Sequence, residues 1–312
     1  MKHALWYHWL KKVAFALVET PRICFPVSRP RLIMTLLVKN EEQTLEQVLR
    51  FHKAQGVDAF IVTDNNSTDH TPDIIERFRR AGWIVAHIRE AGQDYRQKRW
   101  VDRMVWMAKR QFHADWVINA DADEFWYSPT GSLKTEMAQA RGNVLAAEVR
   151  NVLPEEGKSI WEWDKTVRYV PEPERYDLSL YSTFGKMYKK VCHRTAGYLQ
   201  IAMGNHKVTM WPKWEQRSGI IIYHYQIRTR QQFVEKMVNG GRQLENNPSR
   251  HGGRHWRYYY TIYKEGRLEE EYDRVVGTKV REALAADGYI LQDNKVPTLL
   301  AALGDEAGHQ HP

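Results

Sequence analysis

Three carboxylates close the apolar run at residues 116–126, which reads WVINADADEFW. The run predicts a buried strand that ends at Ala120 and opens on a polar edge, where Asp121, Asp123 and Glu124 follow. Residues two apart in an extended chain point to the same side, so Asp121 and Asp123 would aim at one point. Carboxylates held that close repel each other unless a cation lies between them, and Mg²⁺ and Mn²⁺ are the hard cations that oxygen ligands suit. For an isolated D-x-D pattern, an acidic turn after a strand is the plainer interpretation.

Strands and helices alternate around this run. The apolar pattern predicts helices that begin at Asn40, as a capping residue, and at Thr71, and a longer helix over 97–112. Strands are predicted at 32–38, 59–63, 83–88, 116–120 and 144–149. This alternation predicts an α/β fold with a mainly parallel, Rossmann-like sheet flanked by helices. Open sheets of this kind bind ligands at the carboxyl ends of their strands, which is where Asp64 and Asp121 fall.

The regular alternation of strands and helices ends after residue 150. Prolines at 154, 171 and 173 interrupt a segment rich in Trp, Tyr and charge, which predicts loops and short antiparallel strands that form an acceptor site. A strand is predicted at 220–225, a helix at 231–240 and a helical region at 268–284. The tail after Gly304 is expected to fray.

Composition narrows the class of protein. The chain has 312 residues, and its 43% of hydrophobic residues is typical of a soluble globular protein. Its formal charge of +8 indicates an anionic partner. Its two cysteines give no disulfide framework and fit a reducing, cytoplasmic compartment. Residues 1–27 are too short and too interrupted to span a bilayer. They form either an interfacial helix at the inner face of the membrane or a helix packed on the protein body.

Six motifs in register carry a resemblance to a known family. VKNEE at 38–42, TDNNSTDHT at 63–71 and DADEF at 121–125 resemble the nucleotide-sugar half of a GT-A fold glycosyltransferase of family 2. The later GNHKV at 204–208, YHYQIRTRQQFVEKMVNGG at 223–241 and HWR at 255–257 resemble one bacterial subgroup of that family. The residue pattern predicts an amphipathic segment at 1–30 and a tail at 305–312. The resemblance implies a nucleotide-sugar-binding GT-A half at 31–150 and a C-terminal mixed region at 151–304 that binds the acceptor and completes the metal site.

The resemblance also implies roles for residues at the strand ends. Asp123 would bind a Mn²⁺ or Mg²⁺ ion that bridges the diphosphate, and Asp121 would support it through the ribose or the water shell of the metal. Asp64 would bind the nucleobase or its ribose. The remaining residues expected to line the nucleotide pocket are Val38, Asn40, Glu41 and Asn66.

Later residues would complete the site. His224 is the expected third metal ligand, with His206 as its substitute. Arg228 and Arg230, in a mobile loop next to it, are the candidates to bind the diphosphate. Lys98 and Arg99 are further cations of the donor loop. An inverting transfer needs a carboxylate to take the proton of the acceptor hydroxyl, and the motifs do not single one out; Glu124 serves catalysis or else holds the strand end.

The resemblance therefore implies an enzyme that moves a sugar from a nucleoside-diphosphate sugar, with a UDP-sugar favoured, to a glycan or lipid-linked glycan acceptor of a bacterial surface polysaccharide. A nucleotidyltransferase is a rival, but residues 39–42, KNEE, are not the glycine-rich basic loop that it normally needs. A noncatalytic protein that binds nucleic acid or a membrane through the cations and aromatics at 254–260 is the second rival; nucleic-acid binding is not expected.

Overall fold

The computed structural model describes residues 10, 12–14, 16–19, 27–90, 97–179, 181, 184, 189–245 and 253–308. They fall into two compact units, one made of residues 1–148 and 189–221 and the other of residues 149–188 and 222–312. Two of the crossings between the units fall within strands, in β6 (Val144–Val152) and β11 (Glu215–His224). The predicted halves 31–150 and 151–304 differ from this division, because 189–221 returns to the first unit.

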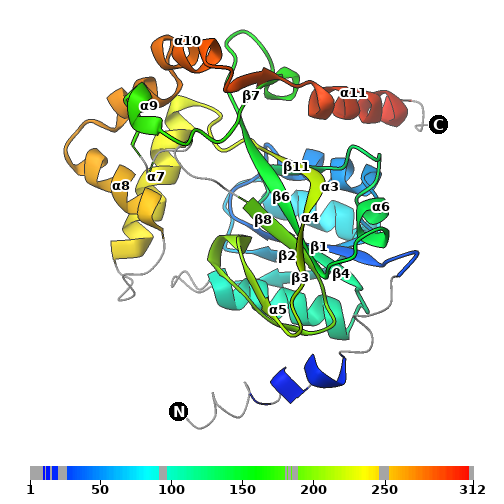
Figure 1. Cartoon of the computed structure of the whole chain (residues 1–312). Helices are drawn as coiled ribbons and strands as arrows, with labels where there is room; N and C mark the ends of the chain where they lie inside the picture. Colours follow the sequence, from blue (N-terminus) through cyan, green and yellow to red (C-terminus); the bar gives the residue numbers. More distant parts are fainter. Residues whose placement is uncertain are drawn as a thin grey trace. The chain divides into compact units, whose positions relative to one another are not determined.

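A mainly parallel sheet forms the first unit, as predicted (Figure 1). Its central strands run in the order β3-β2-β1-β4 and are all parallel. Antiparallel β8 pairs with β4, and β6 then pairs with β8, which explains why 189–221 joins this unit. The strands and helices of the unit are β1 (Leu32–Val38), α3 (Leu45–Ala54), β2 (Ala59–Asp64), α4 (Thr71–Arg80), β3 (Ile84–Arg89), α5 (Gln97–Arg110), β4 (Trp116–Ala120), β5 (Glu124–Tyr127), α6 (Leu133–Ala138), β8 (Lys189–Arg194), β9 (Tyr198–Ile201), η3 (Met203–Asn205) and β10 (Val208–Met210).

Alternating side chains give this sheet two apolar faces. Ile33, Ile61 and Val117 pack against α5, where Met104 and Val105 are fully buried. Figure 1 shows α3 and α4 on the other side of the sheet from α5. A sheet covered on both faces leaves its strand ends as the surface open to ligands.

The second unit has its own core and is mostly helical. Few of its residues are in strands: the end of β6 pairs with β7, and β7 pairs with β12, both antiparallel. The expected loops and short antiparallel strands after residue 150 are therefore present. Its elements are η1 (Ile160–Glu162), β7 (Lys165–Val167), η2 (Pro173–Tyr176), α7 (Arg230–Glu245), α8 (Arg254–Lys264), α9 (Leu268–Val276), α10 (Thr278–Ala286), β12 (Ile290–Gln292) and α11 (Lys295–Gly308). The tail expected to fray after Gly304 continues as helix to Gly308.

Two glycines let α7 and α8 approach closely in this core. A Cβ at Gly240 would lie 2.6 Å from the ring of Trp256, and one at Gly241 would lie 2.3 Å from Cβ of Tyr260. Tyr259 on α8 is fully buried against Phe233. Of the aromatics at 254–260, Tyr259 therefore belongs to the core of the second unit, and Trp256, Tyr258 and Tyr260 are partly buried against it.

Candidate active site

Two loops that follow adjacent strands are joined by hydrogen bonds at one edge of the first unit. Val38 ends β1 level with Asp64 at the end of β2, and Asn65 N donates to Val38 O at 2.8 Å. Asn40 has a left-handed backbone (φ 55°), and its Oδ1 accepts from Thr68 N at 2.8 Å. The prediction that Asn40 caps a helix is wrong: the N-cap of α3 is Thr44. The turn at 41–44 separates Asn40 from the helix, and its side chain joins the two loops instead.

Further contacts fix the same pair of loops. Glu41 N donates to Thr71 Oγ1 at 2.8 Å, and His70 N donates to a Glu42 carboxylate oxygen at 2.9 Å. Asp64 is 5% exposed, and its Oδ1 accepts from both the backbone N and the hydroxyl of Ser67, at 3.0 and 2.6 Å. The loops after β1 and β2 thus form one rigid rim, with main-chain groups and carboxylates set at the strand ends.

The DADE segment is a turn between β4 and β5. Glu124 N donates to Asp121 O at 3.2 Å and closes the turn. The extended chain that would aim Asp121 and Asp123 at one point is therefore absent from this segment. Asp121 keeps 38% of its side chain exposed, Asp123 is 3% exposed and Glu124 is fully buried.

A buried lysine lies between two of these carboxylates. Lys190, on β8, is 5% exposed; its Nζ lies 2.6 Å from Asp121 Oδ2 and also forms an ion pair with Glu124. Burial opposes the charge of Lys190, but attraction by Asp121 and Glu124 outweighs it and raises the pKa of the ammonium above its usual range. The positive charge that the carboxylate cluster demands is thus supplied in part by the protein itself.

Glu124 also holds the strand end. Its Oε2 accepts from Asp121 N and from Trp126 Nε1, both at 3.4 Å. Behind it, His52 Nε2 accepts from Trp126 N at 2.9 Å, so the ring is neutral, and burial lowers the pKa of His52 to about 3. These contacts are those of a residue that positions the turn, the second of the two roles considered for Glu124.

The sequence reasoning missed Lys190. It lies 69 residues after Asp121 in the chain, and only the antiparallel pairing of β8 with β4 brings the two together. The one sequence signal for a buried lysine here was the basic pair Lys189-Lys190, which is followed directly by the apolar residues Val191 and Cys192.

His206 also belongs to this unit. Its Nδ1 lies 2.9 Å from Lys189 O, next to Lys190 in the chain. A ring that donates Nδ1–H to a carbonyl presents its Nε2 lone pair, which is the tautomer of many metal-binding histidines. Metal binding is chemically compatible with Asp121, Asp123 and this ring, although the described residues contain no group of three or more His, Cys, Asp or Glu already arranged to hold an ion.

The other predicted site residues lie apart from this cluster in the chain. Lys98 is exposed at the start of α5, and residues 91–96 of the donor loop lie outside the described residues. His224 ends β11 in the second unit. Arg228, in the same unit, is only 6% exposed, and Gln232 Oε1 accepts from its backbone N at 3.3 Å.

Arg230, the neighbouring cation in that motif, is a structural residue. Its guanidinium forms a two-pronged ion pair with Asp273, at 3.0 and 2.5 Å, and lies 4.7 Å from the centre of the Tyr272 ring. The phosphate-binding role considered for Arg230 would require this contact to break.

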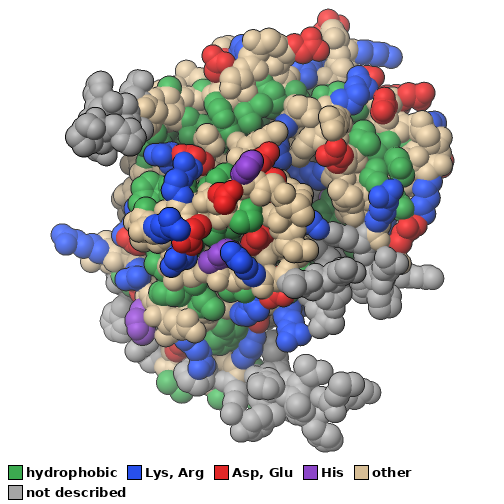
Figure 2. All heavy atoms as spheres, turned by 180° about the vertical axis from the view of Figure 1, so that it is seen from behind, with side chains coloured by type: hydrophobic (Ala, Val, Ile, Leu, Met, Phe, Trp, Pro, Cys, Tyr) green, Lys and Arg blue, Asp and Glu red, His purple; other side chains and the backbone are tan. Residues whose placement is uncertain are grey.

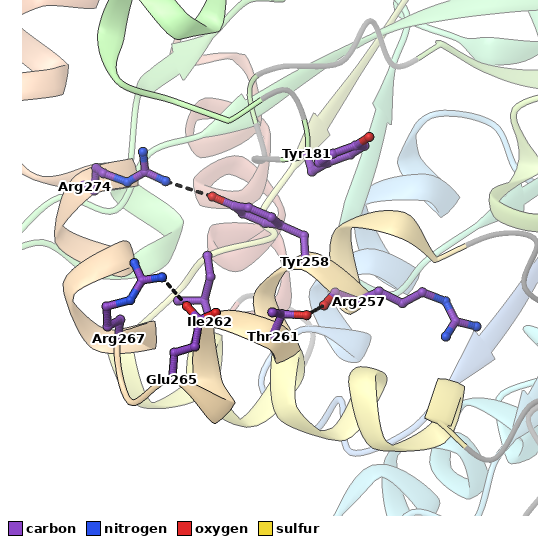
Figure 3. Close-up of a pocket in the computed structure, with 8 residues that line it drawn as sticks. All are labelled: Tyr181, Arg257, Tyr258, Thr261, Ile262, Glu265, Arg267 and Arg274. Carbon is purple, nitrogen blue, oxygen red and sulfur yellow. Dashed lines mark hydrogen bonds and ion pairs between the residues drawn. The ribbon is translucent and has the colours of Figure 1, made fainter.

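The second unit contains an open hollow of ≈ 750 Å³ (Figure 3). Two of its cations contact groups of the protein: Arg274 Nη2 donates to Tyr258 OH at 2.9 Å, and Arg267 pairs with Glu265. The residues that line it are Tyr181, Arg257, Tyr258, Thr261, Ile262, Glu265, Arg267 and Arg274.

One face of the molecule carries charges of both signs. On the face drawn in Figure 2, Lys and Arg side chains lie among Asp and Glu side chains. Nucleic-acid backbones are bound by cations gathered on one face or stripe, and this face is of mixed sign.

Comparison with known proteins identifies the class of the enzyme. Residues 36–134 match the model of the family described as "Glycosyl transferase family 2". This stretch runs from the end of β1 through β5 and contains the polar loops after β1, β2 and β4. It is a family 2 glycosyltransferase domain, and the chain is a glycosyltransferase. The resemblance drawn from the motifs is confirmed at this level. Among curated proteins, none matches the chain significantly.

Solved structures similar to the chain are distant in sequence. S. aureus TarS, residues 1–349, in complex with UDP is 13% identical, with 76% of this chain and 71% of that chain covered and a TM-score of 0.39. The mannosyltransferase PcManGT from Pyrobaculum calidifontis, in complex with GDP-Man and Mn²⁺, is 12% identical, with 97% and 90% covered and a TM-score of 0.40. Glucosyl-3-phosphoglycerate synthase from Mycobacterium tuberculosis, in complex with Mg²⁺ and UDP, is 15% identical, with 53% and 57% covered and a TM-score of 0.31.

Proposed function

We propose that the chain transfers a sugar from a nucleoside-diphosphate sugar, preferably a UDP-sugar, to a hydroxyl of a glycan or lipid-linked glycan in bacterial surface polysaccharide synthesis. One observation carries the proposal. Within the matched domain, the polar loops after β1 and β2 and the acidic turn after β4 lie at the carboxyl edge of one parallel sheet. That edge is where open α/β sheets bind nucleotides.

The rim formed by the first two loops is the proposed nucleoside site. Asp64, held by Ser67, would accept hydrogen bonds from the base or ribose, and the main chain at Val38 and Asn40 would line the pocket. Glu41 and Asn66 lie in the same loops. Preorganised groups of this kind bind without paying for loop ordering, which favours affinity.

The acidic turn is the proposed diphosphate and metal site. Oxygen ligands suit Mn²⁺ or Mg²⁺, which would neutralise charge on the departing diphosphate when bound. We propose Asp123 as the direct ligand and Asp121 as a supporting one, because Lys190 already engages Asp121. Lys190 would hold Asp121 and Glu124 ionised and in place, and so keep the turn in one geometry during the reaction. His224 or His206 would complete the set.

The acceptor would bind in the region 151–304, where the hollow of the second unit offers the rings of Tyr181 and Tyr258 (Figure 3). Lys98 and Arg228 are the proposed diphosphate cations. Glu124 is fully buried, so we assign it to positioning and leave the base of the inverting transfer to another carboxylate.

Slow hydrolysis of the donor tests this function without a known acceptor. The purified chain is incubated with Mn²⁺ and each of a panel of UDP-, GDP- and dTDP-sugars, and release of the nucleoside diphosphate is measured. We expect release from a UDP-sugar, and its loss with a chelator and in Asp123→Ala. Absence of release and of transfer from every donor, with bacterial glycan extract supplied as acceptor, would refute the proposal.

A further inference from the structure

The helix that precedes the sheet is fixed to α5 by its charged side. Lys12 Nζ lies 2.8 Å from Asp102 Oδ2, and Glu19 Oε2 lies 2.5 Å from Lys109 Nζ. Between these two ion pairs Ala16 is 1% exposed. Of the two alternatives predicted for residues 1–27, packing on the protein body is therefore present over the described residues 10, 12–14 and 16–19.

The opposite side of this helix is apolar and faces outward. Leu10 is 50% exposed, Leu17 54% and Val18 78%, and Ala14 is exposed as well. Their spacing of four, seven and eight residues places them on one stripe of an α-helix. A surface helix of a globular protein normally turns such a stripe toward the core. This helix has the inverted orientation: its polar side contacts the protein body, and its apolar stripe faces outward.

A loop of the same unit exposes two tryptophans. Trp211 is 58% exposed and Trp214 is 45% exposed. The loop that carries them is fixed from below by the buried Asn143, whose Nδ2 donates to Pro212 O at 2.7 Å and whose Oδ1 accepts from Trp214 N at 2.8 Å. The backbone that presents these large apolar side chains is thus rigid.

The helix and the tryptophan loop meet at Gly197. Gly197 N donates to Glu19 Oε2 at 3.1 Å, and Gly197 O accepts from Trp211 N at 2.8 Å. Gly197 therefore joins Glu19, at the end of this helix, to the loop that carries Trp211. We call the set Leu10, Ala14, Leu17, Val18 and Trp211 the outward apolar surface.

We propose that the outward apolar surface docks on an anionic lipid bilayer. Single exposed apolar residues are ordinary, but an aligned stripe beside an exposed indole marks an interaction site. Charge selects lipid as the partner: the first 31 residues contain six Lys and Arg and a single acidic residue, Glu19. Apolar side chains and tryptophan at the depth of the headgroups, with cations around them, are the signature of an interfacial helix.

The docking is peripheral. In the part of the chain that the structure describes, no helix is long and apolar enough to cross a membrane. If the proposed function holds, this surface would keep the enzyme where lipid-linked acceptors lie; that consequence rests on the proposed function, whereas the docking itself does not.

Vesicle flotation of the full chain tests the docking. The vesicles contain phosphatidylcholine alone or with phosphatidylglycerol, and the variants are Leu17→Gln/Val18→Gln and, independently, Trp211→Gln. Tyr169→Gln, which alters an apolar residue 38% exposed outside this surface, is the matched control. We expect the native chain and the control to float with the anionic vesicles, with binding weakened by salt, and each test variant to bind at least tenfold more weakly.

UDP titration of every variant separates this test from that of the proposed function, because the substituted residues lie outside the nucleotide site. Variants that lose vesicle binding and bind UDP as the native chain does support the docking. Flotation that is unchanged in both test variants would overturn it. Failure of the native chain to bind anionic vesicles would also overturn the proposal. If sedimentation then shows a dimer that Leu17→Gln/Val18→Gln dissociates, a second copy of the chain covers the stripe instead of lipid.

Discussion

Replacement of Lys190 by methionine is the perturbation that bears most directly on the acidic turn. Methionine keeps most of the volume and the unbranched shape of the lysine but removes its charge. In the native chain that charge contacts Asp121 at 2.6 Å and pairs with Glu124. Lys190→Met therefore leaves two carboxylates facing each other without their cation.

The expected cost is set by burial. Asp121 retains water on 38% of its side chain and can be partly solvated, but Glu124 is fully enclosed. Removal of one partner of a buried ion pair costs about 3–5 kcal/mol, since the other charge remains buried and uncompensated. We expect the free energy of unfolding to fall by about this amount at pH 8. The loss should be smaller at pH 5, where a proton on a carboxylate can replace the missing charge.

Urea denaturation measures this loss, and Lys134→Met serves as the control. Lys134 also forms an ion pair through two oxygens, with Asp58 at 2.9 and 3.0 Å, but both side chains are about a third exposed. Such a surface pair contributes about 0.2–1 kcal/mol. If Lys190→Met costs no more than Lys134→Met, or if its cost does not change with pH, the assigned role of Lys190 is wrong.

Three further outcomes follow from the structure. Burial lowers the pKa of His52 to about 3 and of His193 to about 4, so below pH 6.5 the unfolded chain binds more protons than the folded one. The free energy of unfolding, measured with urea, should therefore fall from pH 6.5 toward pH 4 by up to about 1.4 kcal/mol per pH unit for each ring. The fall should be shallower in His52→Gln. Gly241→Ala should lower the stability of the second unit by about 1–3 kcal/mol through overpacking against α8, and an unchanged thermal midpoint would contradict the close approach. Calorimetric titration of His206→Ala and His224→Ala with UDP and Mn²⁺ identifies the third metal ligand as the histidine whose loss weakens metal-dependent binding. If both variants bind UDP with the affinity of the native chain, neither histidine is a metal ligand.

Apolar periodicity predicted most of the sheet, because buried parallel strands are continuous apolar runs. β1, β2 and β4 agree with the predicted strands to within a residue. The local details differ where a side chain finds a partner far along the chain. Asn40 binds a loop 28 residues away in place of a helix end, and the D-x-D segment folds into a turn.

The candidate site was predictable in its carboxylates but not in its cation. Spacing can mark Asp121 and Asp123, since they are neighbours in sequence. Lys190 reaches them only through the pairing of β8 with β4, and the inverted orientation of the N-terminal helix depends on ion pairs with α5. Both are consequences of tertiary contacts that a single sequence does not display.

The central claim is that the matched domain binds a nucleoside diphosphate with a metal at the acidic turn. Calorimetric titration with UDP, with and without Mn²⁺, tests it directly on the native chain, on Asp123→Ala and on Asp73→Ala, an exposed aspartate of α4 as control. We predict metal-dependent binding by the native chain and the control, and its loss in Asp123→Ala. Equal binding by Asp123→Ala, or binding of neither UDP nor GDP by the native chain with metal present, would contradict the account.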